Sequence, residues 1–318
     1  MSDFMFTVVL VVALLLPAGA SASTDWQAPR HQEHSLVGQI WSHRAQAFVS
    51  ASDLFESGGH AEFLLLGEKH DNPDHHARRL TLLQELVAAE RIGLISFEML
   101  SRQQQSRLDS LDPALSGDED ALREHLDWDI GWHWPWYQPV LELGLQADGL
   151  QLVAANLDSS EIVSVYRDGV PDETLQRLNA TARQQLVQDI DDSHCGLLPE
   201  DQFPAMAAVQ QARDQAMAES LQRPLANARE ASGTRVLVAG NFHVRHDLGV
   251  PNYLDSESVV TVAFLEVDPE RTDPAVYQGE TDGKAAWDFI WFTPAIEELD
   301  NCDRMQESVA GEEPGAAL

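Results

Sequence analysis

The chain has 318 residues, enough for one large domain or two smaller ones with a full hydrophobic core, and its apolar content of 44% is ordinary for a globular protein. Its 20 Lys and Arg residues stand against 52 Asp and Glu residues, and the formal net charge of −32 would repel nucleic acid, so we expect no nucleic-acid partner. The acidic residues are spread along the chain, which favours a solvated acidic surface over one that collects cations.

The N-terminus has the pattern of an export signal. Residues 4–16 form a continuous apolar run that is short for a membrane span, and Pro17 then leads into small residues with A-x-A cleavage sites. We interpret residues 1–22 as a signal peptide and expect an exported protein. Asp3 and the lack of a Lys or Arg before the run depart from the usual pattern, so retention of the segment as an anchor stays open.

Strands and helices alternate over most of the remaining chain. The expected elements, in chain order, are a short hairpin at 40–41 and 47–49, a helix capped by Ser52 that runs through Glu56, a strand at 62–66, a helix at 74–90, a strand at 94–97, interrupted helix at 102–126, a strand at 150–155, helices at 172–189 and 201–222, and strands at 235–239 and 259–265. This order predicts an α/β fold in which helices flank a mostly parallel central sheet.

The two consecutive helices without an intervening strand could be ordinary packing helices, or they could form an inserted helical subdomain that covers the sheet edge, and the two interpretations are compatible. We therefore expect an α/β core from residues 36–158 and 231–299, with the helical insertion at 159–230. Residues 300–318 form an acidic tail whose composition is typical of disorder.

Cys195 and Cys302 are the two cysteines of the chain. In an exported protein a small, even number favours a disulfide, which would tie the middle of the chain to its C-terminal tail. Two unrelated free thiols are the alternative. The wide spacing, without a C-x-x-C pair, does not indicate a zinc knuckle or a thioredoxin motif.

Two of the expected strands end in the same short motif. Gly67-Glu68-Lys69-His70 follows the apolar residues 63–66, and Gly240-Asn241-Phe242-His243 follows the apolar residues 236–239. Parallel strands end at one edge of a sheet, so the two motifs would place two imidazoles, a carboxylate and an amide along one crevice, where open α/β sheets bind ligands.

The polar residues at the strand ends suggest chemistry. His70, Glu98 and His243 could together bind a divalent metal ion, and with Glu68 they are the candidate catalytic residues of a metal-dependent hydrolase. Without a metal, His70 and Glu98 could act as general acid and base. A structural hydrogen-bond network is the alternative for each residue alone. Several polar groups at consecutive buried strand ends, Asn156 among them, favour a functional site.

Two further features leave alternatives open. Arg245 could pair with Asp247 or hold a ligand that carries a carboxylate. The aromatic run at 128–137 could pack in the core or form an apolar wall for a flat ligand. The sequence has no P-loop, no Gly-x-Gly-x-x-Gly and no Gly-x-Ser-x-Gly, which argues against nucleotide binding and against a nucleophile-elbow hydrolase.

Four stretches of the chain resemble the ChaN family, the haem-binding uptake branch of a superfamily that also contains Tiki proteases and erythromycin esterases. These stretches are residues 65–76, 97–99, 212–218 and 239–251. The likeness extends from about residue 36 to 300. It implies a parallel-sheet core with a helical subdomain, and a periplasmic or outer-membrane-associated protein of haem and iron uptake. The chain lacks the lipid-acceptor Cys of lipoprotein members.

The resemblance also implies a cofactor and partners. Family members bind haem through a Tyr and dimerise around paired haems, so we expect haem, a homodimer and an outer-membrane haem receptor system. Tyr253 beside the second motif is our choice of ligand, and Arg245 is a further haem-binding candidate. Tiki-like relatives instead hydrolyse with a metal held by the motif histidines and a Glu, which this chain matches at His70, Glu98 and His243. We predict haem binding, with metal-dependent hydrolysis as the alternative.

Overall fold

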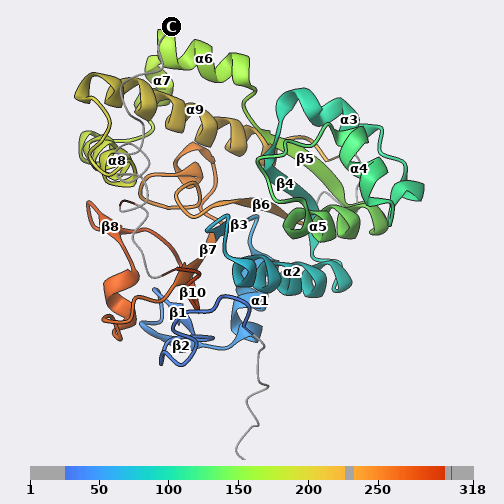
Figure 1. Cartoon of the computed structure of the whole chain (residues 1–318), viewed down its shortest axis with the longest axis horizontal. Coiled ribbons are helices and arrows are strands. Elements are labelled where there is room, and N and C mark those ends of the chain that lie inside the picture. Colours follow the sequence, from blue (N-terminus) through green and yellow to red (C-terminus); the bar gives the residue numbers. More distant parts are fainter. Residues whose placement is uncertain (1–25, 226–232, 298–301, 303–318) are drawn as a thin grey trace, which may run out of the picture.

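The computed structural model describes residues 26–225, residues 233–297 and Cys302 (Figure 1). Within them, one large sheet has the strand order β2-β1-β10-β7-β3-β6-β4-β5. Its strands are β1 (Ile40–Ser42), β2 (Ala47–Val49), β3 (Phe63–Glu68), β4 (Ile92–Ser101), β5 (Gln151–Asn156), β6 (Thr234–Gly240), β7 (Val259–Glu266) and β10 (Phe289–Thr293). Neighbours from β10 to β5 are parallel, and β1 and β2 add an antiparallel edge. The predicted α/β class is confirmed.

Helices cover both faces of this sheet. They are α1 (Ala51–His60), α2 (Pro73–Ala88), α3 (Gln105–Asp109), α4 (Glu119–Leu126), α5 (Trp134–Gln146), α6 (Ser159–Asp168), α7 (Asp172–Leu175), α8 (Ala180–Ser193) and α9 (Phe203–Leu221). Successive side chains of a strand point to opposite faces, so Leu64 and Leu66 of β3 join the core of α2 and α5, whereas Phe63 and Leu65 join Met217 of α9. Both faces of β3 are therefore buried, as its apolar run predicts.

The topology brings the two repeated motifs together. Strands β3 and β6 are adjacent and parallel, with Glu68 in register with Gly240. After β3 the chain passes through α2 to β4, which lies on the far side of β6. After β6 it passes to β7, which lies on the far side of β3. The connections diverge at this point, which opens a crevice at the carboxyl ends of the two strands.

Several elements differ from the expectation. Strand β10 was not predicted, although all five of its residues are buried. Helix α5, which was not predicted, begins at Trp134 within the aromatic run at 128–137. Pro135 lies in its first turn, where a proline is tolerated, but Pro139 lies inside the helix and obscures the pattern. Helix α1 is capped by Ser50 rather than Ser52.

The region between β5 and β6 is helical, as expected, but α9 is not remote from the sheet. Met217 and Leu221 of α9 pack on the face of β3 that carries Leu65. The helical region thus contributes one layer of the core, and its status as an insertion stays a prediction. None of the helices in the described parts of the chain is long and apolar enough to cross a membrane. The proposed signal peptide and all of the proposed tail except Cys302 lie outside the described residues.

Candidate functional site

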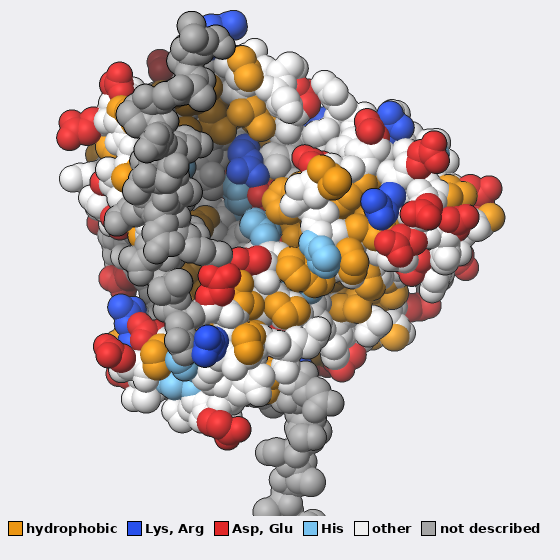
Figure 2. All heavy atoms as spheres, viewed as in Figure 1, with side chains coloured by type: hydrophobic (Ala, Val, Ile, Leu, Met, Phe, Trp, Pro, Cys, Tyr) orange, Lys and Arg blue, Asp and Glu red, His pale blue; other side chains and the backbone are white. Residues whose placement is uncertain are grey.

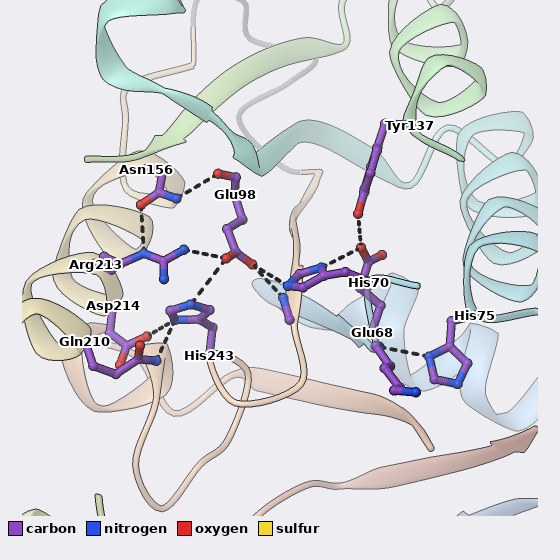
Figure 3. A network of polar contacts seen from close by, with 12 residues as sticks. Glu68, His70, His75, Glu98, Tyr137, Asn156, Gln210, Arg213, Asp214 and His243 are labelled. Atoms are coloured by element: carbon purple, nitrogen blue, oxygen red, sulfur yellow. Dashed lines mark hydrogen bonds and ion pairs between the residues drawn. The ribbon is translucent and has the colours of Figure 1, made fainter. Parts of the chain in front are cut away.

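Glu98 of β4 lies at the centre of a buried polar network (Figure 3). One carboxylate oxygen accepts a hydrogen bond from Arg213 Nη2 of α9 at 2.6 Å, and the other accepts from the Gly240 amide at 2.7 Å. Burial alone would raise the pKa of Glu98, but the positive charges of His243 and Arg213 outweigh it and hold that pKa far below its ordinary value. Glu98 is therefore a carboxylate at any physiological pH.

His243 follows β6 and lies between two carboxylates. Its Nδ1 is 2.5 Å from Asp214 Oδ1 of α9, and its Nε2 is 3.4 Å from Glu98 Oε1. Burial lowers the pKa of His243, but Glu98 and Asp214 more than compensate and raise it to about 9. The imidazolium is thus a structural cation at neutral pH, flanked by two acids.

A second buried network lies behind His70. Glu68 Oε1 accepts a hydrogen bond from the Tyr137 hydroxyl at 2.6 Å, and its other oxygen pairs with Arg79 of α2. Arg79 is completely buried and also donates to the Trp136 carbonyl. Burial lowers the pKa of Arg79 to about 10, so its guanidinium still carries a positive charge at neutral pH.

His70 connects the two networks. Its Nδ1 is 3.2 Å from Glu68 Oε1, and its Nε2 is 3.9 Å from Glu98 Oε2. Burial lowers the pKa of His70, and Glu98 partly opposes this effect. The four residues Glu68, His70, Glu98 and His243 therefore share one cleft, as their positions at the ends of the expected strands predict.

A cavity of about 710 Å³ opens at this edge of the sheet. Figure 2 shows a hollow on this face in which histidine and basic side chains lie close to hydrophobic ones. The polar networks above form one wall of the cavity. Helices α8 and α9, the loop after β6, strand β7 and the segment just before β10 add the apolar residues Leu186, Ile190, Met206, Val209, Leu248, Phe264, Leu265 and Trp287. The combination of an apolar wall and a few placed polar groups is typical of a small-molecule site.

The sequence profile of the family described as haem-binding uptake, Tiki superfamily, ChaN matches residues 54–254, which is more than half of the chain. The protein belongs to this family. A search of curated proteins finds no match.

Two solved structures resemble the structure of this protein. The structure described as "Cofacial heme binding to ChaN of Campylobacter jejuni" is 24% identical, with a TM-score of 0.64, and the alignment covers 79% of this chain and 95% of that one. A mutant of the erythromycin esterase EreC, in its open conformation, is 13% identical over 80% of this chain and 94% of its own, with a TM-score of 0.42. The first likeness agrees with the ChaN fold assigned by the profile.

Arg245, proposed as a haem-binding residue, lines the cavity but is already paired. Its guanidinium donates to both carboxylate oxygens of Asp247, at 2.8 and 2.6 Å, and to Asp189 Oδ2 of α8 at 2.9 Å. It therefore fastens α8 to the loop after β6. A role in binding haem stays a prediction.

Tyr253, our choice of haem ligand, does not lie in the cleft. It is 4% exposed, packs in the core that contains α9, and its hydroxyl is 3.4 Å from Gln211 Oε1. It is not among the residues that line the cavity. Tyr253 is the last residue of the short helix Val250–Tyr253, and its side chain packs against the core that contains α9. This position does not support Tyr253 as the haem ligand.

The metal-site prediction also finds no support in the donor geometry. In the part of the chain that the structure describes, no cluster of three or more His, Cys, Asp or Glu side chains is arranged to hold a metal ion. Arg213 and the Gly240 amide occupy the oxygens of Glu98, and Asp214 occupies Nδ1 of His243. The residues present do not fit the metal that the hydrolase alternative requires, and the comparisons do not favour that alternative.

The predicted disulfide between Cys195 and Cys302 is present. It fastens the residue just beyond the C-terminal end of α8 to the chain that follows β10. The aromatic run packs mainly against the core. Trp134 is buried, and Trp132 contacts the ring of His70 edge-on, with the ring centres 4.9 Å apart.

Our sequence reasoning gave no role to Arg213, Asp214, Arg79 or Tyr137. Arg213 and Asp214 lie within one of the stretches that resemble ChaN, so a signal for them was present. Tyr137 was noted only as the last residue of the aromatic run at 128–137. Arg79 carried no such signal, because a charged residue in a helix usually belongs to a solvated face.

Gly240 contacts the site so closely that a methyl group there should displace His70. A Cβ atom on Gly240 would lie 2.9 Å from His70 Nε2. We expect Gly240→Ala to shift the His70 imidazole resonances in NMR spectra and to cost about 1–3 kcal/mol in unfolding free energy, because the core must rearrange. Gly131→Ala, which would meet only the side chain of Asp129, is the control. Unchanged His70 resonances would contradict this geometry.

Proposed function

We propose that this protein binds haem in the cavity between the sheet edge and helices α8 and α9, and that it serves haem and iron uptake as an exported protein. Family membership carries the proposal, since the haem-binding uptake profile spans residues 54–254 and so contains the sheet edge and both helices. The N-terminal pattern of the sequence supports export.

The residues of the cavity suit haem. A volume of about 710 Å³ lies within the ordinary range for organic ligands. The apolar wall suits the porphyrin face, and the half-exposed Lys69 and the partly exposed Arg213 are cations that could pair with carboxylates of the porphyrin. Imidazoles line the same space, and an imidazole is one of the side chains that hold haem iron.

The described assembly of the relative supports the expected homodimer. The Campylobacter jejuni structure is described as cofacial haem binding, which supports two haems face to face and hence a homodimer of this chain around them. We further propose that an outer-membrane haem receptor system supplies the haem. Sedimentation of the protein with and without haemin tests the dimer.

A haemin titration tests the function. The purified protein should show a saturable shift of the Soret absorption band at stoichiometric haemin. Val209→Glu puts a carboxylate into the apolar wall, and we expect it to weaken binding about tenfold or more, because a charge must be desolvated beside the porphyrin.

Val163→Glu is the matched control. Val163 lies on α6, is 63% exposed and does not line the cavity, so this variant should bind like the parent. Absence of any saturable haemin binding by the parent would overturn the proposed function. If both variants bind haemin as tightly as the parent does, the haem does not bind in this cavity.

A further inference from the structure

The C-terminal turn of α8 forms part of the cavity wall. Ile190 and Ser193 of this turn line the cavity, and so does His194, the residue that follows it. The amide of His194 donates a hydrogen bond to the carbonyl of Ile190 at 3.1 Å. The amide of Gly196 donates to the carbonyl of Asp191, also at 3.1 Å. Any loosening of this turn therefore changes the wall of the cavity.

The sequence of this turn does not favour a stable helix end. The carbonyl end of a helix carries a partial negative charge, which basic side chains stabilise and acidic ones destabilise. Asp191 and Asp192 lie in the last turn of α8, and no basic residue does. Cys195 then adopts a φ angle of 61°, in the left-handed region that side chains other than glycine rarely adopt. Local interactions therefore favour fraying of the turn.

The packing of α8 is also modest. Its three buried residues belong to a small apolar cluster that, among the described residues, contains no residue of a strand. The buried members of the cluster are Leu178, Ala182, Leu186, Ile190, Ala207 and Leu248. Asp189 pairs with Arg245 of the loop after β6 at 2.9 Å, but the turn that lines the cavity lies beyond this ion pair. The disulfide at Cys195 lies directly after that turn and holds it in place.

This disulfide joins the end of α8 to another part of the cavity lining. Its second half, Cys302, follows β10, and the chain after β10 is fastened at Ile296. The amide of Ile296 donates to Glu266 Oε1 at 3.2 Å, and Glu266 lines the cavity. Both cysteines are partly exposed. An exposed disulfide is open to attack by an external thiolate, so this bond can be reduced in the folded protein.

We propose that the Cys195–Cys302 disulfide is a redox-sensitive latch on the cavity. The intact bond holds the last turn of α8 in the wall, and its reduction by a dithiol loosens the turn and speeds the exit of the ligand. One thiolate of the dithiol attacks a sulfur of the bond and forms a mixed disulfide, which the second thiolate then resolves. Two electrons and two protons pass to the cysteines, and the dithiol becomes a disulfide. The inference rests on the proposed function for the identity of the ligand.

Hydrogen exchange of the ligand-free full chain tests the latch directly. The chain has two cysteines, so dithiothreitol has one disulfide to reduce. After complete reduction, peptides over residues 190–197 should exchange about tenfold faster or more, because the turn opens locally. Peptides over β3 should exchange at the same rate before and after reduction. Titration of the free thiols checks that the reduction is complete.

Release of a porphyrin tests the consequence for the ligand. Iron-free protoporphyrin is the probe, because its fluorescence reports binding and it has no iron that dithiothreitol could reduce. Its dissociation from the parent should become about fivefold faster or more on reduction. The double variant Cys195→Ser/Cys302→Ser should release the probe at the fast rate with and without dithiothreitol. Reoxidation of the parent should restore slow release.

The outcomes separate the latch from the proposed function. Unchanged exchange over residues 190–197 and unchanged release after complete reduction would overturn the latch while the proposed function stands. Faster exchange over β3 as well would show that the bond supports the whole fold, which also overturns a local latch. A parent that binds neither haemin nor protoporphyrin would overturn the proposed function, and the exchange measurement would still decide whether reduction loosens α8.

Discussion

Arg79→Met is expected to lower the free energy of unfolding by about 3–5 kcal/mol, because it leaves the Glu68 carboxylate charged and buried without its cation. Neither side chain of this ion pair is exposed at all. Tyr137 donates one hydrogen bond to Glu68 but cannot neutralise it. Urea-induced unfolding of the haem-free protein, followed by circular dichroism, measures the loss.

The double variant Glu68→Gln/Arg79→Met removes both charges, and we expect it to regain most of the lost stability. Arg123→Met is the matched control. It removes an Arg that pairs with Glu119 on the surface of α4 and is 45% exposed, so its cost should lie below about 1 kcal/mol. Arg79→Met with the stability of the parent would show that the buried pair is not ionised as described.

The stability of the protein should fall as the pH rises from about 7 to 9, and His243 should cause most of this loss. Glu98 and Asp214 raise the pKa of His243 from 6.5 to about 9 despite its burial. Because the pKa of His243 is higher in the folded than in the unfolded state, its protonation stabilises the fold. This stabilisation is fully present below the unfolded pKa of 6.5 and is lost as the pH rises through 9. The shift corresponds to a contribution on the order of 3 kcal/mol.

Urea unfolding at a series of pH values from 6 to 10 tests this expectation. His243→Gln cannot take up the proton, so its stability should vary less over this range than that of the parent. His60→Gln, at an exposed position of α1, is the control and should keep the pH dependence of the parent. If the parent and His243→Gln lose stability in parallel, the imidazolium between Glu98 and Asp214 does not exist.

The sequence predicted the sheet edge well because its signal is local. Strands β3 and β6 are short apolar runs that end in Gly and then in polar residues, and a buried strand of a parallel sheet has this composition. Strand β10 has a similar apolar run but lacks such a terminal motif. Helix α5 was missed because Pro139 and four Trp residues nearby hide its periodicity.

The roles of the residues around the sheet edge could not be predicted from local sequence patterns. Arg213 and Asp214 are adjacent in α9, yet one side chain binds Glu98 and the other binds His243.

By itself, the sequence predicted the α/β class and the meeting of Glu68, His70, Glu98 and His243 at one edge, and it favoured the disulfide and the family through its cysteine count and its motifs. Local apolar runs and the single carboxyl-terminal edge of a parallel sheet account for the class and for the meeting of these residues. Only the tertiary structure decided which of these groups are paired, and that Tyr253 does not line the cavity. Charge pairing and burial depend on how helices far apart in the chain pack on the sheet, and no local pattern encodes that packing.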